Sequence, residues 1–182
     1  MFYPILEMPD RKDDALGLPC GSAPILTKAA CESGLVGGDI VIDGSGNVWV
    51  SSGTSVSTFS NAGVALSPSA GYTGGGLNGF PIAIDGSGNV WIGNAYFPGS
   101  GGGGIVSEFS NAGAALSPFG YAAQEFEGSA SIAIDGSGNV WDGSEYENVL
   151  EISSSGAAIV DFLGGAQIAI DGSGDIWDNG AS

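Results

Sequence analysis

The chain has 182 residues, of which 43% are hydrophobic, and this length and composition are typical of a folded domain with a core of ordinary size. Its 34 glycines favour short strands and tight turns over long helices, because glycine is costly inside a helix. The formal net charge is −17, and the three basic residues all precede residue 29. This charge excludes nucleic acid as a partner held through its phosphates, and it excludes an anionic membrane surface bound through a basic patch.

The first 39 residues form an N-terminal segment that precedes a set of repeats. The opening stretch MFYPILEMPDRKDD lacks the basic start and the continuous apolar run of a signal peptide. No stretch of the chain has the 18 or more apolar residues (a rough minimum) of a membrane-spanning helix. We therefore expect no membrane association.

The two cysteines, Cys20 and Cys31, both lie in this segment. We predict that they form a local disulfide, which implies a secreted or cell-surface protein. Two free thiols in a cytosolic protein are the alternative. A zinc site is disfavoured because the chain has no histidine and two thiolates do not complete a tetrahedral shell.

One decapeptide then occurs four times along the chain. It reads IVIDGSGNVW at 40–49, IAIDGSGNVW at 82–91 and 132–141, and IAIDGSGDIW at 168–177. Recurrence at a period of roughly 40 residues is typical of propellers and solenoids.

A second element follows the decapeptide at a nearly fixed distance. It reads FSNAGVALSP at 59–68, FSNAGAALSP at 109–118 and, more loosely, ISSSGAAIVDF at 152–162. Apolar and β-branched runs bounded by Gly, Ser and Asn predict four short strands in each repeat. In the first repeat these strands are expected at Ile40–Asp43, Asn47–Ser51, Val56–Ser60 and Val64–Ser67.

The predicted fold class is all-β, a β-propeller built of four-stranded antiparallel blades. Adjacent apolar residues in IAI and NVW require covering layers on both faces of each strand, as stacked blades provide. The tryptophans of the repeats are expected to be largely buried between blades: Trp49, Trp91, Trp141 and Trp177. The repeats divide into three blades and a half blade: about 40–81, 82–131, 132–167 and 168–182.

The pair of motifs, IAIDGSGNVW followed by SxFSNAGxALSP, resembles the repeats of NHL-type and streptogramin-lyase-like (virginiamycin B lyase) β-propellers. The resemblance covers about residues 40–182. The lyase family implies magnesium-assisted ring opening with histidines in the site. Because this chain has no histidine, we assign a role in that chemistry to none of its residues.

NHL-type propellers commonly have six blades, whereas this chain has three repeats and a half. Three ways of completing the last blade stay open. The N-terminal stretches FYPILEM (2–8) and APILTKA (23–29) supply its missing strands and close a four-bladed ring, another chain completes it in a ring or a filament, or the chain is part of a longer propeller.

The DGSGN stretch of each decapeptide has an alternative interpretation as a calcium loop. Asp43, Ser45 and Asn47 have the one, three, five spacing of such a loop. Position six, however, is Val48 instead of glycine, and position twelve is Thr54 instead of glutamate. We therefore expect no cofactor and an Asx-type hairpin turn with glycines at positive φ. The weak cation candidates are Asp43, Asp85, Asp135 and Asp171.

DGSGN and SNAG are expected to share one end of each blade. The opposite end varies in length and chemistry between repeats, and variable loops are where propellers carry binding sites. Aromatic rings beside carboxylates can hold a sugar, a cation or a peptide. The ligand-binding candidates in these loops are Tyr72, Tyr96, Phe97, Tyr121, Glu125, Glu127, Asp142, Glu145 and Tyr146.

The sequence therefore predicts a non-catalytic extracellular module that binds a protein or glycan ligand, or that self-assembles through open blade edges. An enzyme is the alternative, either streptogramin-lyase-like or active on glycans through carboxylates. A pair such as Glu125 with Asp142 or Glu145 would then supply the acid and the base.

Overall fold

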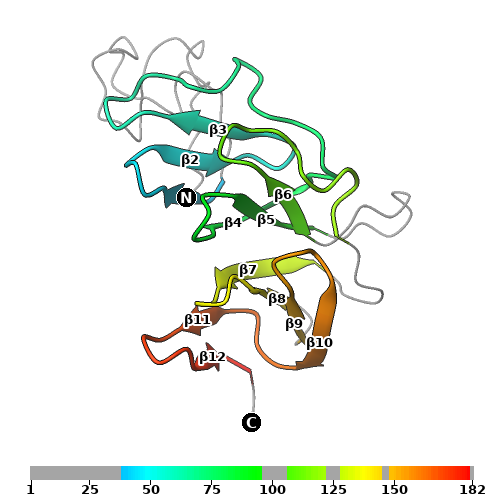
Figure 1. The fold of residues 1–182 in the computed structure, drawn as a ribbon. Coiled ribbons are helices and arrows are strands. Elements are labelled where there is room, and N and C mark those ends of the chain that lie inside the picture. The colour runs from blue at the N-terminus through cyan, green and yellow to red at the C-terminus, as the bar shows by residue number, and fades with distance from the viewer. Residues whose placement is uncertain (1–37, 96–105, 122–127, 145–147, 181–182) are drawn as a thin grey trace, which may run out of the picture.

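The computed structural model describes residues 38–95, 106–121, 128–144 and 148–180 (Figure 1). The predicted disulfide between Cys20 and Cys31 and the candidate closing strands at 2–8 and 23–29 lie outside the described residues. No helix in the described ranges is long and apolar enough to cross a membrane.

Twelve short strands form four antiparallel sheets in the described part of the chain. The first sheet has the order β1 (Ile40–Ile42), β2 (Val48–Ser51), β3 (Val56–Phe59). The second has the order β4 (Gly79–Ile84), β5 (Val90–Asn94), β6 (Val106–Phe109). The third has four strands, β7 (Ser129–Ile134), β8 (Val140–Ser144), β9 (Asn148–Ile152) and β10 (Ala158–Leu163), and the fourth has two, β11 (Ile168–Ile170) and β12 (Ile176–Asp178).

The first strands of the four sheets are neighbours in chain order. β4 contacts β1 on one side and β7 on the other, and β7 contacts β11. The sheets thus follow one another side by side, and their first strands lie next to one another on an arc (Figure 1). The all-β, antiparallel part of the prediction is confirmed, while the number of blades and the closure of a ring stay predictions.

The fourth strand expected at Val64–Ser67 in the first repeat is not formed as a regular strand. Ala65 pairs with Phe59 in a single bridge, and the amides of Leu66 and Ser67 both donate to the carbonyl of Thr58. Two donors on one carbonyl break the ladder, and Pro68 has no N–H with which to resume it. In the third sheet, where no proline follows the turn, β10 forms a full strand with one register shift.

The DGSGN stretches form the predicted Asx-type hairpin turns. Asp43 Oδ1 accepts the backbone N–H groups of Ser45 and Asn47 at 2.8 and 2.9 Å, and Gly46 has φ of 80°. Asp43 Oδ2 accepts the Asn47 amide at 2.9 Å and also Trp49 Nε1 at 3.1 Å. This last bond, which joins each turn to the tryptophan of the next strand, recurs in all four repeats.

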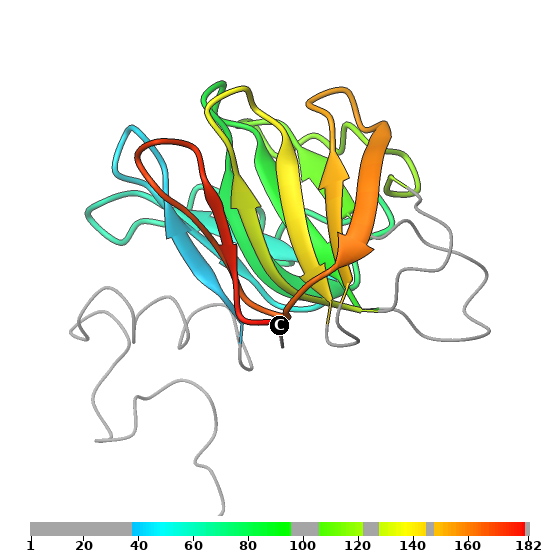
Figure 2. The same ribbon diagram turned by 90° about the horizontal axis from the view of Figure 1, so that it is seen from below.

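The two kinds of turn lie at the same end of the sheets, as predicted. A Cβ built on Gly46 of the first DGSGN turn would be 3.8 Å from the Cβ of Asn61 in the first SNAG turn. Gly88 and Asn111 stand in the same relation in the second sheet. The tips of the hairpins accordingly point to one side of the molecule (Figure 2).

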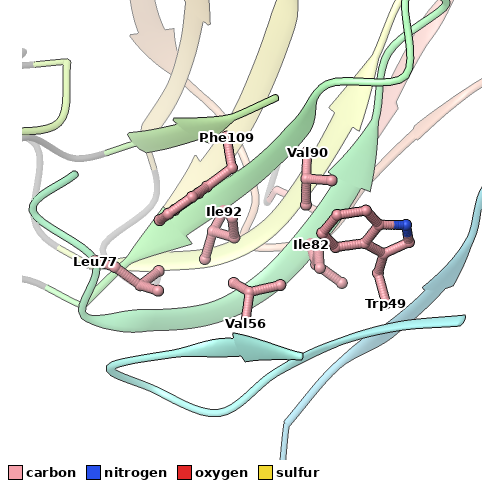
Figure 3. Close-up of a cluster of buried hydrophobic side chains, with 7 residues drawn as sticks. All are labelled: Trp49, Val56, Leu77, Ile82, Val90, Ile92 and Phe109. Atoms are coloured by element: carbon pink, nitrogen blue, oxygen red, sulfur yellow. The ribbon is translucent and has the colours of Figure 1, made fainter. Parts of the chain in front are cut away.

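The core lies between successive sheets and is built around the tryptophans. Trp49 of β2 shares a buried cluster with Ile82 of β4 and with Val90 and Ile92 of β5, and its ring lies next to Ile82 and Val90 (Figure 3). The rest of this cluster is Val56, Leu77 and Phe109. A second cluster joins Trp91 to the third sheet, with Val106, Val140, Leu150 and Ile152.

The prediction that all four tryptophans are buried holds for two of them. Trp49 and Trp91 are 2% and 0% exposed, whereas Trp141 is half-buried and Trp177 is 63% exposed. A tryptophan is covered only where a further sheet follows its own. Trp141 faces a sheet of two strands, and no described sheet follows the one that carries Trp177.

Candidate functional site: a depression where the first strands begin

An open depression of about 410 Å³ lies where the first strands of the four sheets begin. We call it the inner-strand depression. Its lining residues are Gly38, Asp39, Phe80, Pro81, Ser129, Ala130 and Gln167. All of these lie just before or in the first residues of β1, β4, β7 or β11, at the opposite end of those strands from the DGSGN turns.

Asp39 supplies a carboxylate to the depression and ties the first sheet to the second. Its Oδ1 accepts the backbone N–H of Ile40 at 2.8 Å, and its Oδ2 accepts that of Ile82 at 3.4 Å. The Ser51 hydroxyl shares its one proton between the carbonyl oxygens of Asp39 and Phe80. Asp39 itself is exposed, so its carboxylate is held in place and still reaches solvent.

Phe80 and Gln167 add an aromatic ring and an amide. The side chain of Phe80 is 45% exposed, and its ring also borders Gly53. Gln167 is exposed, with its backbone N–H donating to Asn179 Oδ1 at 2.9 Å. The depression therefore combines a carboxylate, an amide, a hydroxyl group and an aromatic face.

Ser129 supplies the hydroxyl group, which donates to Oδ1 of Asp142 at 2.6 Å. Asp142 is 0% exposed, and its second oxygen, Oδ2, has no hydrogen-bond partner. Burial raises the pKa of Asp142 well above its ordinary value, while the bond from Ser129 acts in the opposite direction. A fully buried carboxyl group with one free oxygen thus stands directly behind a residue that lines the depression.

The predicted candidate Asp142 is therefore placed behind the depression and not on an exposed rim. Asp39, Ser129 and Gln167 were not among the predicted site residues. A comparison of the repeats carries the signal that could have found Ser129, because glycine stands at its place in the neighbouring repeats, at Gly79 and Gly165.

Two other candidates, Tyr72 and Tyr121, pack against tryptophans. The ring centroids of Trp49 and Tyr72 are 5.9 Å apart, and those of Trp91 and Tyr121 are 5.5 Å apart. The Tyr121 hydroxyl donates to Glu108 Oε2 at 2.6 Å. Burial and the neighbouring Glu108 raise the pKa of Tyr121 to about 12. Neither tyrosine lines the inner-strand depression.

The remaining candidates fall outside the described residues. They are Tyr96, Phe97, Glu125, Glu127, Glu145 and Tyr146.

The four turn aspartates, the weak cation candidates, use their oxygens within the turns. For Asp43 and Asp135, burial acts to raise the pKa, but the hydrogen bonds from the tryptophan, the asparagine and the turn amides outweigh it, so the pKa is lowered. The bond from Trp177 leads the causes that lower the pKa of Asp171. In the described ranges, no three or more acidic or thiol side chains gather where they could hold a metal ion.

Comparison with known proteins shows a likeness of fold. No family model and no curated protein sequence matches this chain. The structure of a streptogramin B lyase superposes with a TM-score of 0.56 at 15% identity, over 76% of this chain and 46% of that one. A catalytically inactive virginiamycin B lyase from Staphylococcus aureus with quinupristin gives 0.56 and 15%, over 76% and 47% of the two chains.

A candidate gluconolactonase also superposes, with a TM-score of 0.53 at 12% identity, over 74% of this chain and 51% of that one. The chain therefore spans about half the length of these proteins. The predicted resemblance to lyase-like β-propellers is confirmed as a likeness of fold.

Proposed function

We propose that the chain is a non-catalytic binding module whose ligand occupies the inner-strand depression. The observation that carries this proposal is the convergence of residues from all four sheets on one hollow, which brings together Asp39, Phe80, Ser129 and Gln167. A concave site with a few convergent polar groups and an aromatic face is what small-ligand sites have in common.

The ligand class follows from the lining and the overall charge. Carboxylate, amide and hydroxyl groups pair with the hydroxyl groups of a sugar, and an exposed phenyl ring packs against its C–H face. With a net charge of −17, an anionic ligand is repelled. A neutral or cationic, hydroxyl-bearing ligand such as a glycan unit fits best.

The test is an NMR titration with a panel of neutral and amino sugars. Backbone amide signals of Gly38, Ala130 and Gln167 should shift, whereas those of Ser45 and Ser137 in the distant turns should not. Asp39→Asn should weaken binding several-fold, and Ser87→Ala, at an exposed turn position, should leave it unchanged. Shifts confined to the turns would overturn the proposal.

The non-catalytic part of the proposal is tested by turnover. Its support is the residue set, since the chain has no histidine and no basic residue beyond Lys28. Incubation with quinupristin, with and without Mg²⁺, should leave the ring intact. Ring opening that survives removal of contaminating enzyme would show the alternative, a lyase-like activity.

A second candidate function is self-association through the faces of the end sheets. Trp177 is 63% exposed, while Ile40 and Ile42 of the first sheet are 44% and 64% exposed. Inside the molecule, Trp49 and Ile82 share one buried cluster, and Ile84 packs against that cluster. Ile82 and Ile84 are the repeat equivalents of Ile40 and Ile42. Trp177 of one copy therefore has a matching face on the first sheet of another copy.

Such a contact is heterologous, so it closes a ring or extends a filament. Light scattering should give a mass that is a multiple of 18.0 kDa for the wild-type chain and a lower multiple for Trp177→Ala. A wild-type particle of 18.0 kDa at all concentrations would rule out self-association and leave the binding proposal standing.

A further inference from the structure

The third repeat replaces a buried aliphatic residue by an acid. The residue after the repeat tryptophan is Val50 in the first repeat and Ile92 in the second, and both are buried. In the third repeat it is Asp142, which is 0% exposed. The fourth repeat also has an acid there, Asp178, but that residue is exposed. Of the four repeats, only the third therefore buries an acid at this place, which the first two fill with a buried hydrocarbon side chain.

The same repeat also gains a side chain where its neighbours have none. Ser129 stands where Gly79 and Gly165 stand in the adjacent repeats. A Cβ on Gly79 would be 1.8 Å from the carbonyl oxygen of Gly93, so that position tolerates no side chain. Ser129 fits because its neighbour across the sheets is Gly93, where a Cβ would be 1.8 Å from Ser129 Oγ and 3.5 Å from Asp142 Oδ2.

Gly93, Ser129 and Asp142 therefore form one unit, which we call the Gly93–Ser129–Asp142 unit. Burying a carboxyl group whose Oδ2 has no partner opposes folding, and an aliphatic residue at the same place would not. Proteins keep such costly local departures mainly at functional sites. Ser129 lines the inner-strand depression, so the unit has access to a ligand there.

The hydrogen bond within the unit fixes what Ser129 offers. The Ser129 hydroxyl donates its hydrogen bond to Asp142 Oδ1. The lone pairs of the Ser129 oxygen therefore remain free to accept a hydrogen bond from a ligand in the depression. Asp39, the other anchored group of the lining, also only accepts when ionised. Phe80 presents a ring that is 45% exposed, and an aromatic face attracts cations.

We infer that the Gly93–Ser129–Asp142 unit makes the inner-strand depression specific for an organic ammonium ligand. Asp142 is a positioning residue that turns the Ser129 oxygen toward the ligand as an acceptor, Asp39 supplies the opposite charge, and Phe80 packs over the cation. This inference rests on the proposed binding function and names the class of its ligand.

The test compares glucosamine with glucose, which share a ring and differ in one ammonium group, by NMR titration at pH 6. Wild type should bind glucosamine at least about tenfold more tightly than glucose, with shifts at Gly38, Ala130 and Gln167. In Ser129→Gly/Asp142→Ile, which restores the residues of the second repeat, the preference should fall to less than about threefold. Asp142→Ile alone should give an intermediate preference, and Ser87→Ala should keep the wild-type value.

The outcomes distinguish the ammonium preference from the underlying proposal that the depression binds a ligand. If both sugars shift the amides of the depression equally in wild type, or if the restored variant keeps the wild-type preference, the ammonium inference is wrong and the binding proposal stands. If neither sugar shifts those amides, the ammonium inference is wrong, and the panel of neutral and amino sugars decides the binding proposal. Thermal unfolding of each variant checks that lost preference is not lost structure, since the restored variant should unfold at a higher temperature than wild type.

Discussion

At the scale of single residues, the turn aspartates could be predicted and the buried aspartate could not. The DGSGN spacing predicts an Asx-type turn, because the rule depends on neighbours within four residues, and the bonds of Asp43 confirm it. The environment of Asp142 is set by the hydrogen bond from Ser129 and by the space that Gly93 leaves, and these two residues belong to different strands and sheets. Only a comparison between repeats contains that information.

Asp135 and Asp142 of the third repeat should respond to pH with opposite sign. Hydrogen bonds lower the pKa of Asp135 despite its burial, so its contribution to stability is present above the unfolded-state pKa and is lost as pH falls. Burial raises the pKa of Asp142, so its contribution is present below the unfolded-state pKa and is lost as pH rises through the folded-state value.

The measurement is thermal unfolding of wild type, Asp135→Asn and Asp142→Asn between pH 3 and pH 8. The deficit of Asp135→Asn relative to wild type should shrink on acidification from about pH 4, near the ordinary aspartate pKa. The stability of wild type relative to Asp142→Asn should decline as pH rises from about 4. Parallel curves for wild type and Asp142→Asn would show that Asp142 is not desolvated as described.

At the scale of elements, the hairpins follow from the sequence because their turn chemistry is local. The strands β1 and β2 form where the decapeptide predicts them. The segment after each SNAG turn was harder to predict. Val64–Ser67 has the apolar content of a strand, but Leu66 and Ser67 share one carbonyl acceptor, and composition does not reveal such an irregularity.

The DGSGN turn offers a matched pair of glycines in the third repeat. Gly138 has φ of 84°, so Gly138→Ala should destabilise the chain by about 1–2 kcal/mol, the cost of a left-handed backbone for a residue with Cβ. Gly136 does not have positive φ, and a Cβ there would meet nothing within 4 Å. Gly136→Ala should change stability by less than about 0.5 kcal/mol. Equal losses in urea unfolding would contradict the turn geometry.

Two of the tryptophans, Trp91 and Trp177, provide a second matched pair of substitutions. They occupy the same position in their repeats and differ in the exposed fraction of the side chain. Trp91 is 0% exposed, so Trp91→Ala should cost about 3–5 kcal/mol through the cavity it leaves. Trp177 is 63% exposed, and Trp177→Ala should cost less than about 1 kcal/mol in dilute solution. A large, concentration-dependent loss for Trp177→Ala would instead support the contact between copies.

At the scale of the whole molecule, the repeats in the sequence predict the all-β class and the order of the sheets. They do not predict that the outer faces of the first and last described sheets are exposed. The decapeptide places a tryptophan in every repeat, and its periodicity predicts equal burial. Burial differs because it depends on the next sheet along the chain, and Trp177 has none in the described range. The inner-strand depression likewise arises from the meeting of four repeats and is visible in none of them alone.

The charge of the whole molecule leads to a last prediction, which concerns salt. The formal net charge of −17, with 20 acidic residues, opposes the compact state through self-repulsion. Raising NaCl from about 10 mM to about 150 mM shortens the Debye length from about 30 Å to about 8 Å, so the unfolding temperature should rise by several degrees. No rise would show that repulsion contributes little to the stability of this fold.

Divalent salts at matched ionic strength distinguish screening from a bound cation. Because both oxygens of Asp43 already accept hydrogen bonds within the turn, CaCl₂ and MgCl₂ should raise the unfolding temperature by the same amount as each other and only slightly more than NaCl. A stabilisation by Ca²⁺ alone that Asp43→Asn reduces would mean that the turn gives up its internal bonds to a cation. The same stabilisation reduced instead by Asp39→Asn would place the cation in the inner-strand depression, where the carboxylate reaches solvent.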